Sequence, residues 1–187
     1  MQIENKFFEK VLVIKPKIFA DNRGFFYESY QFEKCKALGI DMAFLQDNHS
    51  YSKEAGTIRG MHFQNPPNAQ SKLIRVVRGA IINKIVDIRR NSPTFLNFES
   101  VELSAENNLF LYIPVGFANG FETLTNDCEV LYKVDAYYAP ESDMSFAFND
   151  PEIGINWNVK KPILSERDSI APKFAEIDTP FVYGENS

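Results

Sequence analysis

A chain of 187 residues fits one domain, is long enough to bury a full core and leaves little room for a second module. Its formal net charge of −5 excludes a general electrostatic attraction to nucleic acid or to an acidic membrane, so any phosphate must be met by a few placed Arg or Lys residues. Charged residues among the first ten leave no room for a signal-peptide core, and no later stretch reaches transmembrane length, which predicts a cytoplasmic protein.

Strand patterns dominate the chain. Alternating or aromatic-rich apolar runs predict strands at residues 11–19, 25–30, 72–77, 80–88, 98–103, 109–113 and 129–137. The pair Arg78-Gly79 between two such runs predicts a tight hairpin, whereas helical signals are confined to about 31–38 and 165–170.

Many short strands without βαβ alternation predict an all-β fold over a single domain, residues 1–187. The architecture that protects the edges of such strands and leaves a pocket between two sheets is the cupin-like jelly roll, a double-stranded β-helix with a few short helices. The last dozen residues contain Pro180, Gly184 and a polar end, and we expect them to form a loosely held tail.

Reactive side chains are densest between Gln46 and Lys72. Alternate residues of an ideal strand share a face, so Arg59 and His62 would point to opposite sides unless the chain bulges, which Gly60 permits. Spacing alone therefore leaves open whether Arg59 and His62 belong to one site.

Histidine and cysteine are scarce. His49 and His62 are the only histidines and cannot supply the His-rich cage of a metal-dependent cupin, so no catalytic transition metal is expected. A site of two histidines and a carboxylate is the alternative, as is a hydrogen-bonded structural role for either ring. Cys35 and Cys128 are interpreted as reduced thiols.

Two later segments place polar groups among aromatic ones. Tyr132 and Tyr138 are an even number of residues apart, so on one strand they would face the same side, although packing in an aromatic core explains them equally. Ser165 and Asp168 have the spacing of a capping box, which alone favours a helix start.

Together these segments resemble the nucleotide-sugar 3,5-epimerases that act on dTDP-4-keto-6-deoxy-glucose, the dTDP-4-dehydrorhamnose 3,5-epimerase family. The resembling blocks follow the family's order from about residue 3 to 172, and they include residues 19–25, 46–50, 57–64, 114–121, 132–141 and 164–168. The resemblance implies a jelly roll assembled as a homodimer with exchanged strands. It also implies an isomerase that epimerises a nucleotide-linked 4-keto-6-deoxy hexose at C3, C5 or both.

The resemblance assigns catalytic roles to four residues. His62 is the base, Asp168 its partner and Tyr132 the opposing acid, while Lys72 stabilises the oxyanion. A proton beside a ketone becomes acidic only because its removal gives an enolate, so the reaction needs a base, an acid and an oxyanion donor. Nothing in this chemistry requires a cofactor.

Substrate-binding roles follow in the same way. The expected contacts are Arg23 and Arg59 with the diphosphate, Phe26 and Glu28 with the nucleoside, Gln46 and Asn48 as polar positioners, Tyr138 as an aromatic wall, and Asn119 near the sugar.

Asn119 is also a departure, because the family usually has His before this Gly-Phe pair. An amide cannot titrate near neutrality, so the change could alter which carbon is epimerised. Two alternative functions are a nucleotide-sugar 3,4-ketoisomerase of the same fold and a non-catalytic jelly roll that binds sugar nucleotides.

Overall fold

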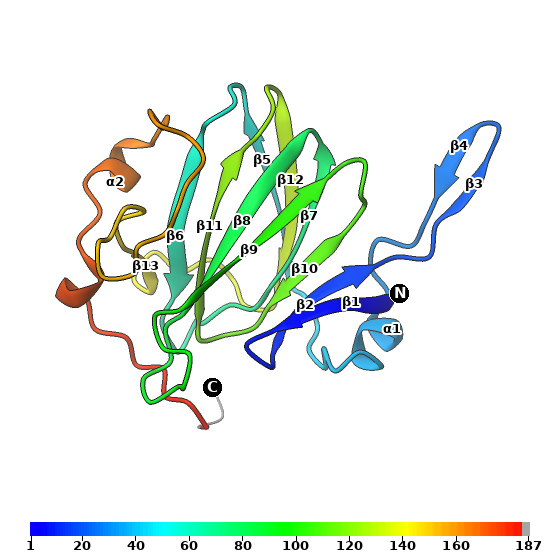
Figure 1. Ribbon diagram of the computed structural model, residues 1–187. Helices are drawn as coiled ribbons and strands as arrows, with labels where there is room; N and C mark the ends of the chain where they lie inside the picture. The colour runs from blue at the N-terminus through cyan, green and yellow to red at the C-terminus, as the bar shows by residue number, and fades with distance from the viewer. Residues whose placement is uncertain (185–187) are drawn as a thin grey trace.

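The computed structural model describes residues 1–184 as two antiparallel sheets packed face to face (Figure 1). The six-stranded sheet contains, in spatial order, β1 (Gln2–Phe7), β2 (Val11–Lys15), β10 (Phe110–Ile113), β7 (Lys72–Arg78), β12 (Cys128–Val134) and β5 (Gln46–Ser52). The five-stranded sheet contains β13 (Asp143–Ser145), β6 (Ile58–Gln64), β11 (Phe117–Thr123), β8 (Ala80–Asp87) and β9 (Phe98–Ser104). The predicted all-β jelly roll is confirmed.

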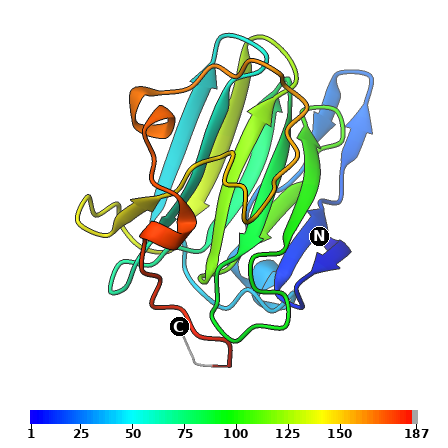
Figure 2. The same cartoon turned by 60° about the vertical axis from the view of Figure 1, so that its left-hand side comes forward.

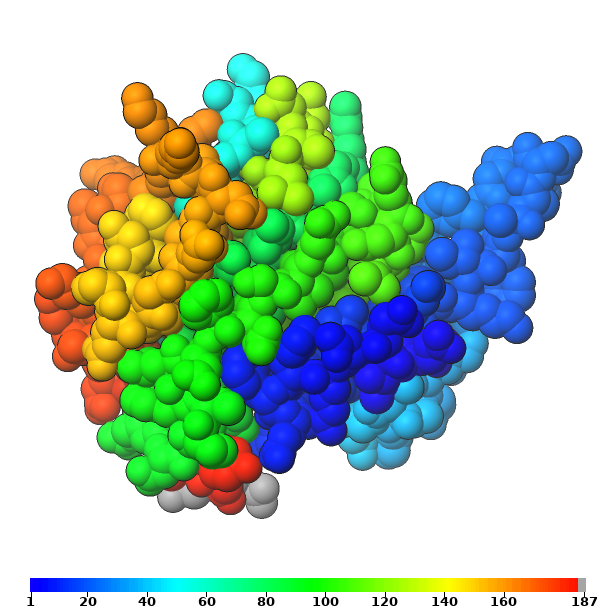
Figure 3. All heavy atoms as spheres, in the orientation of Figure 1, coloured from blue at the N-terminus to red at the C-terminus, as the bar shows by residue number. Residues whose placement is uncertain are grey.

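The remaining elements are small. Strands β3 (Phe19–Asp21) and β4 (Gly24–Phe26) form a separate hairpin that projects from the body in Figure 3. The helices are α1 (Phe32–Lys36), α2 (Glu166–Ser169) and the 3-10 turn η1 (Phe174–Glu176). No helix within residues 1–184 is long and apolar enough to cross a membrane.

Apolar residues fill three layers. The inner cluster lies between the sheets and includes Val13, Ile74, Ile85 and Phe121. A second cluster packs the outer face of the five-stranded sheet against the chain after β13, which Figure 2 shows crossing that face. A third covers the outer face of the six-stranded sheet with α1 and its neighbours.

The Arg78-Gly79 hairpin is confirmed, because β7 ends at Arg78 and β8 begins at Ala80. Gly79 has a φ of +75°, and a Cβ there would lie 2.2 Å from the Thr125 hydroxyl oxygen, so a larger residue would be strained and would have to displace Thr125. The predicted strand 11–19 is wrong in its middle, since Pro16 lacks the N–H that a ladder needs and β2 ends at Lys15.

Part of the segment expected to be loose packs against the rest of the chain. Thr179 and Phe181 are buried, and Val182 pairs with Arg90 as an isolated parallel bridge. The apolar side chain of Phe181 joins the second cluster, which gives the chain end a site in the core. The last three residues of the expected tail lie outside the described residues.

Candidate active site

The bulge that would bring Arg59 and His62 together is present in β6. The register of β6 against β11 shifts between the pairs His62–Asn119 and Arg59–Phe121. Gly60 has a φ of +128°, and a Cβ on it would lie 2.5 Å from the Gly120 Cα, so the two strands approach through a pair of glycines. As a result, Arg59 and His62 both line the cavity between the sheets.

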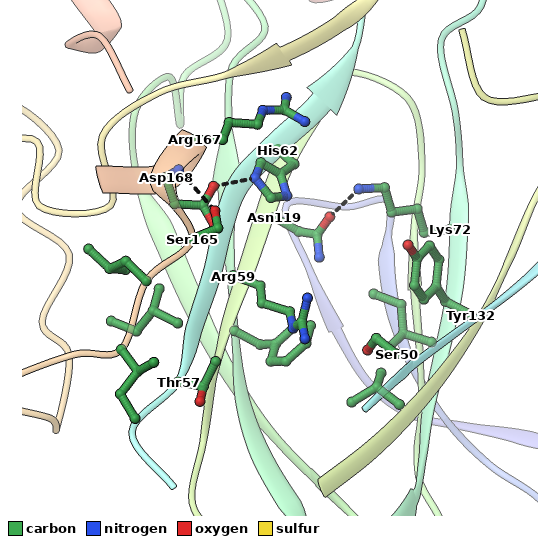
Figure 4. A pocket seen from close by; sticks show the side chains of 16 residues that line it. Ser50, Thr57, Arg59, His62, Lys72, Asn119, Tyr132, Ser165, Arg167 and Asp168 are labelled. Atoms are coloured by element: carbon green, nitrogen blue, oxygen red, sulfur yellow. Dashed lines mark hydrogen bonds and ion pairs between the residues drawn. The ribbon is translucent and has the colours of Figure 1, made fainter. Parts of the chain in front are cut away.

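This cavity has a volume of about 460 Å³ and is lined by residues of both sheets and of the segment 163–168 (Figure 4). Its polar wall carries the residues labelled in the figure, and its apolar wall comprises Ile58, Ile74, Phe121, Val130, Ile163 and Leu164. A second hollow of about 230 Å³ shares His62, Lys72, Tyr132 and Arg167 with it. The two hollows together therefore form one extended site.

A histidine–carboxylate pair lies on one wall of the cavity. The His62 Nε2 atom is 2.7 Å from Oδ1 of Asp168, whose side chain is 4% exposed. Burial alone would raise the pKa of Asp168, but the hydrogen bond and charge of His62 oppose it and hold the pKa below its usual value. The carboxylate is therefore ionised at neutral pH, accepts the Nε2 proton and leaves Nδ1 as the basic nitrogen.

The helix cap expected at Ser165 is present as well, because its hydroxyl accepts the backbone N–H of Asp168 at 3.1 Å. The cap and the ion pair use different atoms of Asp168, its amide and its carboxylate. The local motif thus orients the residue that meets His62.

Lys72 and Tyr132 lie across the cavity from Asp168, and Asn119 lies between, beside its strand partner His62 (Figure 4). The Lys72 ammonium donates to Oδ1 of Asn119 at 2.6 Å, and burial lowers the pKa of Lys72 to about 8, although Asp143 opposes the shift. Burial also raises the pKa of Tyr132, with Arg59 opposing and Asp143 adding to the shift. Tyr132 therefore keeps its proton at neutral pH.

The second hollow carries a polar network that joins β5 to the loop after β12. The Gln46 side chain donates to Asn48 at 2.8 Å and accepts the Tyr138 backbone N–H at 3.0 Å. Tyr138 does not share a strand with Tyr132, because β12 ends at Val134, yet both line this hollow. The same-strand interpretation is wrong, and the loop after β12 explains the shared location.

Two residues of the hollow were missed by the sequence analysis. Arg167 donates to Asp143 at 2.6 Å, and the Tyr138 hydroxyl donates to the same carboxylate at 3.2 Å. The one local signal is that Arg167 immediately precedes Asp168. Nothing in the sequence indicates that Asp143 meets it.

Three predicted binding residues lie away from the cavity of their own chain. Arg23 is at the tip of the β3–β4 hairpin, is 85% exposed and pairs with Asp21. Phe26 is exposed on β4, and Glu28 pairs with Lys34 beyond it. The structure therefore does not bring Arg23, Phe26 or Glu28 to the other site residues.

His49, the second histidine, also lies away from the main cavity. His49 lies on the exposed face of β5 and its Nε2 is 2.9 Å from Glu129, so it does not line the main cavity with His62. Within residues 1–184, no three His, Cys, Asp or Glu side chains gather as possible metal ligands. Both cysteines are free and buried.

Comparison with known proteins identifies the family. The model of the dTDP-4-dehydrorhamnose 3,5-epimerases matches residues 6–176. The chain belongs to this family. It is 49% identical over 164 residues to the dTDP-4-dehydrorhamnose 3,5-epimerase of Salmonella typhimurium, a match that covers 87% of this chain and 89% of the relative.

Solved structures of other epimerases share the fold. The dTDP-6-deoxy-D-glucose-3,5-epimerase of Legionella pneumophila, in complex with dTDP-4-keto-L-rhamnose, has a TM-score of 0.90 and 41% identity over 95% of this chain and 94% of its own. A 3'-monoepimerase from Streptomyces bikiniensis, in complex with dTDP-quinovose, has a TM-score of 0.82 and 36% identity over 88% of this chain and 84% of its own. The chain is accordingly an isomerase of the epimerase class.

Proposed function

We propose that this epimerase converts dTDP-4-keto-6-deoxy-glucose to dTDP-4-keto-rhamnose by inverting C3 and C5 through an enolate. The observation that carries the proposal is the cavity between the sheets, where His62, paired with the buried Asp168, faces Lys72 and Tyr132. A base, an oxyanion donor and a second proton source are what inversion beside a ketone requires.

In the proposed reaction, Nδ1 of His62 removes the proton from the carbon beside the ketone. The electron pair moves onto the ketone oxygen, where the Lys72 ammonium stabilises the negative charge, and Asp168 stabilises the imidazolium that forms. Tyr132 then donates its proton to the opposite face of the same carbon. Proton exchange with solvent restores both residues, and repetition at the second carbon completes the double inversion.

The activity of this site is expected to fall as the pH rises through about 8, because the buried Lys72 then loses its charge. The folded pKa of Lys72 lies below its ordinary value, so burying the ammonium disfavours folding at lower pH and deprotonation relieves that cost. Lys72 therefore contributes no loss of stability in the window where activity is lost. The measurements are turnover and thermal unfolding between pH 6 and 9.5. Turnover should fall through about pH 8, whereas the titration of Lys72 should not lower the unfolding temperature.

Lys72→Met is the matched variant for the pH experiment. We expect turnover to drop by about 10²-fold, since one donor to the oxyanion is removed, and the remaining activity to lack the decline near pH 8. A decline that persists in Lys72→Met would assign the titration to another group.

We further propose that the enzyme works as a homodimer with exchanged strands, in which the hairpin of each subunit completes its partner's site. The support is Arg23, a diphosphate contact by resemblance, which lies in the turn between β3 and β4. Figure 1 shows this hairpin projecting from the body of its own chain. The exposed aromatic rings of Phe19, Phe25 and Phe26 on the same hairpin favour burial against a second copy.

Subunit mixing tests this arrangement. Arg23→Ala should raise KM by about 10- to 100-fold, the effect of losing a hydrogen-bonded charge on phosphate. Mixed with an equal amount of inactive His62→Asn protein and allowed to exchange, it should recover about one quarter of wild-type activity at low substrate, since half the dimers then hold one intact site. No recovery would place Arg23 outside the partner's site.

The ketoisomerase alternative differs in its product. An isomerase moves the carbonyl from C4 to C3, whereas an epimerase leaves it at C4, so the ¹³C carbonyl position of the product separates them. Asn119 is proposed to be compatible with inversion at both carbons, because it still accepts a hydrogen bond from Lys72. The proposed compartment is the cytoplasm.

A further inference from the structure

The carboxylate of Glu122 is buried on the opposite face of the sheet from the cavity. Glu122 follows Phe121 on β11, and adjacent strand residues point to opposite faces, so Phe121 lines the cavity while Glu122 points outward. Glu122 is 1% exposed and touches none of the catalytic groups. The proposed mechanism therefore does not use it.

Glu122 binds the segment that leads to Asp168. This segment, residues 157–164, is called the strap here. The Glu122 carboxylate accepts the Asn158 backbone N–H at 3.0 Å, the Asn158 side-chain amide at 2.6 Å and the Val159 backbone N–H at 3.3 Å. Lys84 is also buried on this face, and the charge of Glu122 acts to raise its pKa against the lowering by burial. The carboxylate thus holds two successive residues of the strap.

The strap runs from this anchor directly into the active site. Ile163 pairs with the start of β6, where its carbonyl accepts the Ile58 N–H at 3.0 Å and its own N–H donates to Gly56 at 3.0 Å. Leu164 and Ser165 then line the cavity, and Ser165 caps α2, which carries Asp168. Only nine positions separate Val159 from Asp168, which is short enough for the anchor to set where α2 begins.

Burying a carboxylate is costly unless its hydrogen bonds are met, and an apolar residue would cover this face at lower cost. The carboxylate, unlike an apolar residue, fixes which residues of the strap lie against β11, because it binds the backbone amides of Asn158 and Val159. We propose that Glu122 is a positioning residue that acts through the strap to hold Asp168 against His62. The expected effect of Glu122 on turnover rests on the proposed function, whereas its expected effect on the contact between Asp168 and His62 does not.

The two histidines make the geometry directly measurable. In ¹⁵N spectra of the imidazole rings, Glu122→Ala should move the His62 signals toward those of Asp168→Ala and leave His49 unchanged, because His49 lies on β5 with Glu129 as its partner. Val101→Ala is the control, a core truncation on β9 that should lower stability without moving either ring. Unchanged His62 signals in Glu122→Ala would overturn the proposal, and this readout needs no substrate.

Turnover supplies the second readout. We expect Glu122→Ala to lower kcat on the order of 100-fold, the cost of misplacing a catalytic group by about an ångström. In an Asp168→Ala background the same change should cost almost nothing, because the group it positions is already gone. Equal losses in both backgrounds would show a role in stability alone. Wild-type protein that is inactive on the sugar would reject the proposed function but not the NMR result.

If Glu122→Ala fails to fold, Asn158→Ala is the substitute. It deletes only the 2.6 Å amide bond and keeps the backbone bonds, so the His62 signals should shift in the same direction by a smaller amount. Glu122→Gln, which keeps an acceptor, should lie between wild type and Glu122→Ala. Wild-type His62 signals in Asn158→Ala would contradict the inference.

Discussion

Turnover of dTDP-4-keto-6-deoxy-glucose is expected to fall by about 10³-fold or more in the His62→Asn variant, with the fold unchanged. The asparagine amide takes the place of Nδ1 and is too short to replace the Nε2 contact with Asp168, so the melting curve also reports the cost of leaving that carboxylate without this partner. What disappears is the second ring nitrogen, the only proposed base. Product formation followed by NMR measures the effect, and circular dichroism with a melting curve serves as the folding control.

Undiminished activity in His62→Asn would remove the basis of the mechanism. A variant that is inactive but also unfolded would be replaced by His62→Gln, whose longer side chain also lacks a basic nitrogen. Either variant should still bind dTDP with near wild-type affinity, because the binding residues lie on other parts of the site.

Tyr132→Phe should separate proton removal from inversion. The ring remains, so packing is kept, but the face of the sugar opposite His62 has no proton donor. We expect product to form about 10³-fold more slowly, while the substrate still exchanges its proton with solvent and keeps its configuration. Mass spectrometry of substrate recovered from deuterated water measures the exchange.

Two outcomes would contradict the role of Tyr132. Product formation at the wild-type rate would make another group the acid. Loss of exchange together with product would show that Tyr132 is needed for proton removal, in which case its role as a donor alone would be wrong.

The residues that sequence analysis linked correctly are those with local signals. Gly60 suggested the bulge in β6, and Ser165 with Asp168 predicted the cap that the structure contains. These features depend on backbone conformation over a few residues, which the residue types themselves restrict. The alternating apolar runs predicted most of the remaining strands for the same reason.

Strands β5 and β11 were missed because neither shows apolar alternation. The inward face of β5 is polar, with Gln46, Asn48 and Ser50, since it lines the site. β11 is buried along its whole length, so its pattern has no exposed face to detect. In β5 the side chains that line the site thus remove the apolar alternation that would have revealed the strand.

Contacts between distant segments were beyond the sequence. Asp143 and Arg167 are 24 residues apart, and Glu122 meets Asn158 across 36 residues, with no motif joining either pair. The outward position of the hairpin was equally hidden, because it follows from how β3 and β4 leave the sandwich. Only the assembled sheets show these relations.

The most direct test is to incubate the protein with dTDP-4-keto-6-deoxy-glucose in deuterated water and to follow the C3 and C5 proton signals by NMR. The proposed double epimerase predicts that both signals are lost to deuterium and that the dTDP-4-keto-rhamnose configuration appears. Exchange at one carbon only would contradict double inversion and direct attention to Asn119. An absence of exchange at both carbons, with saturable binding of the sugar nucleotide, would contradict the proposed function.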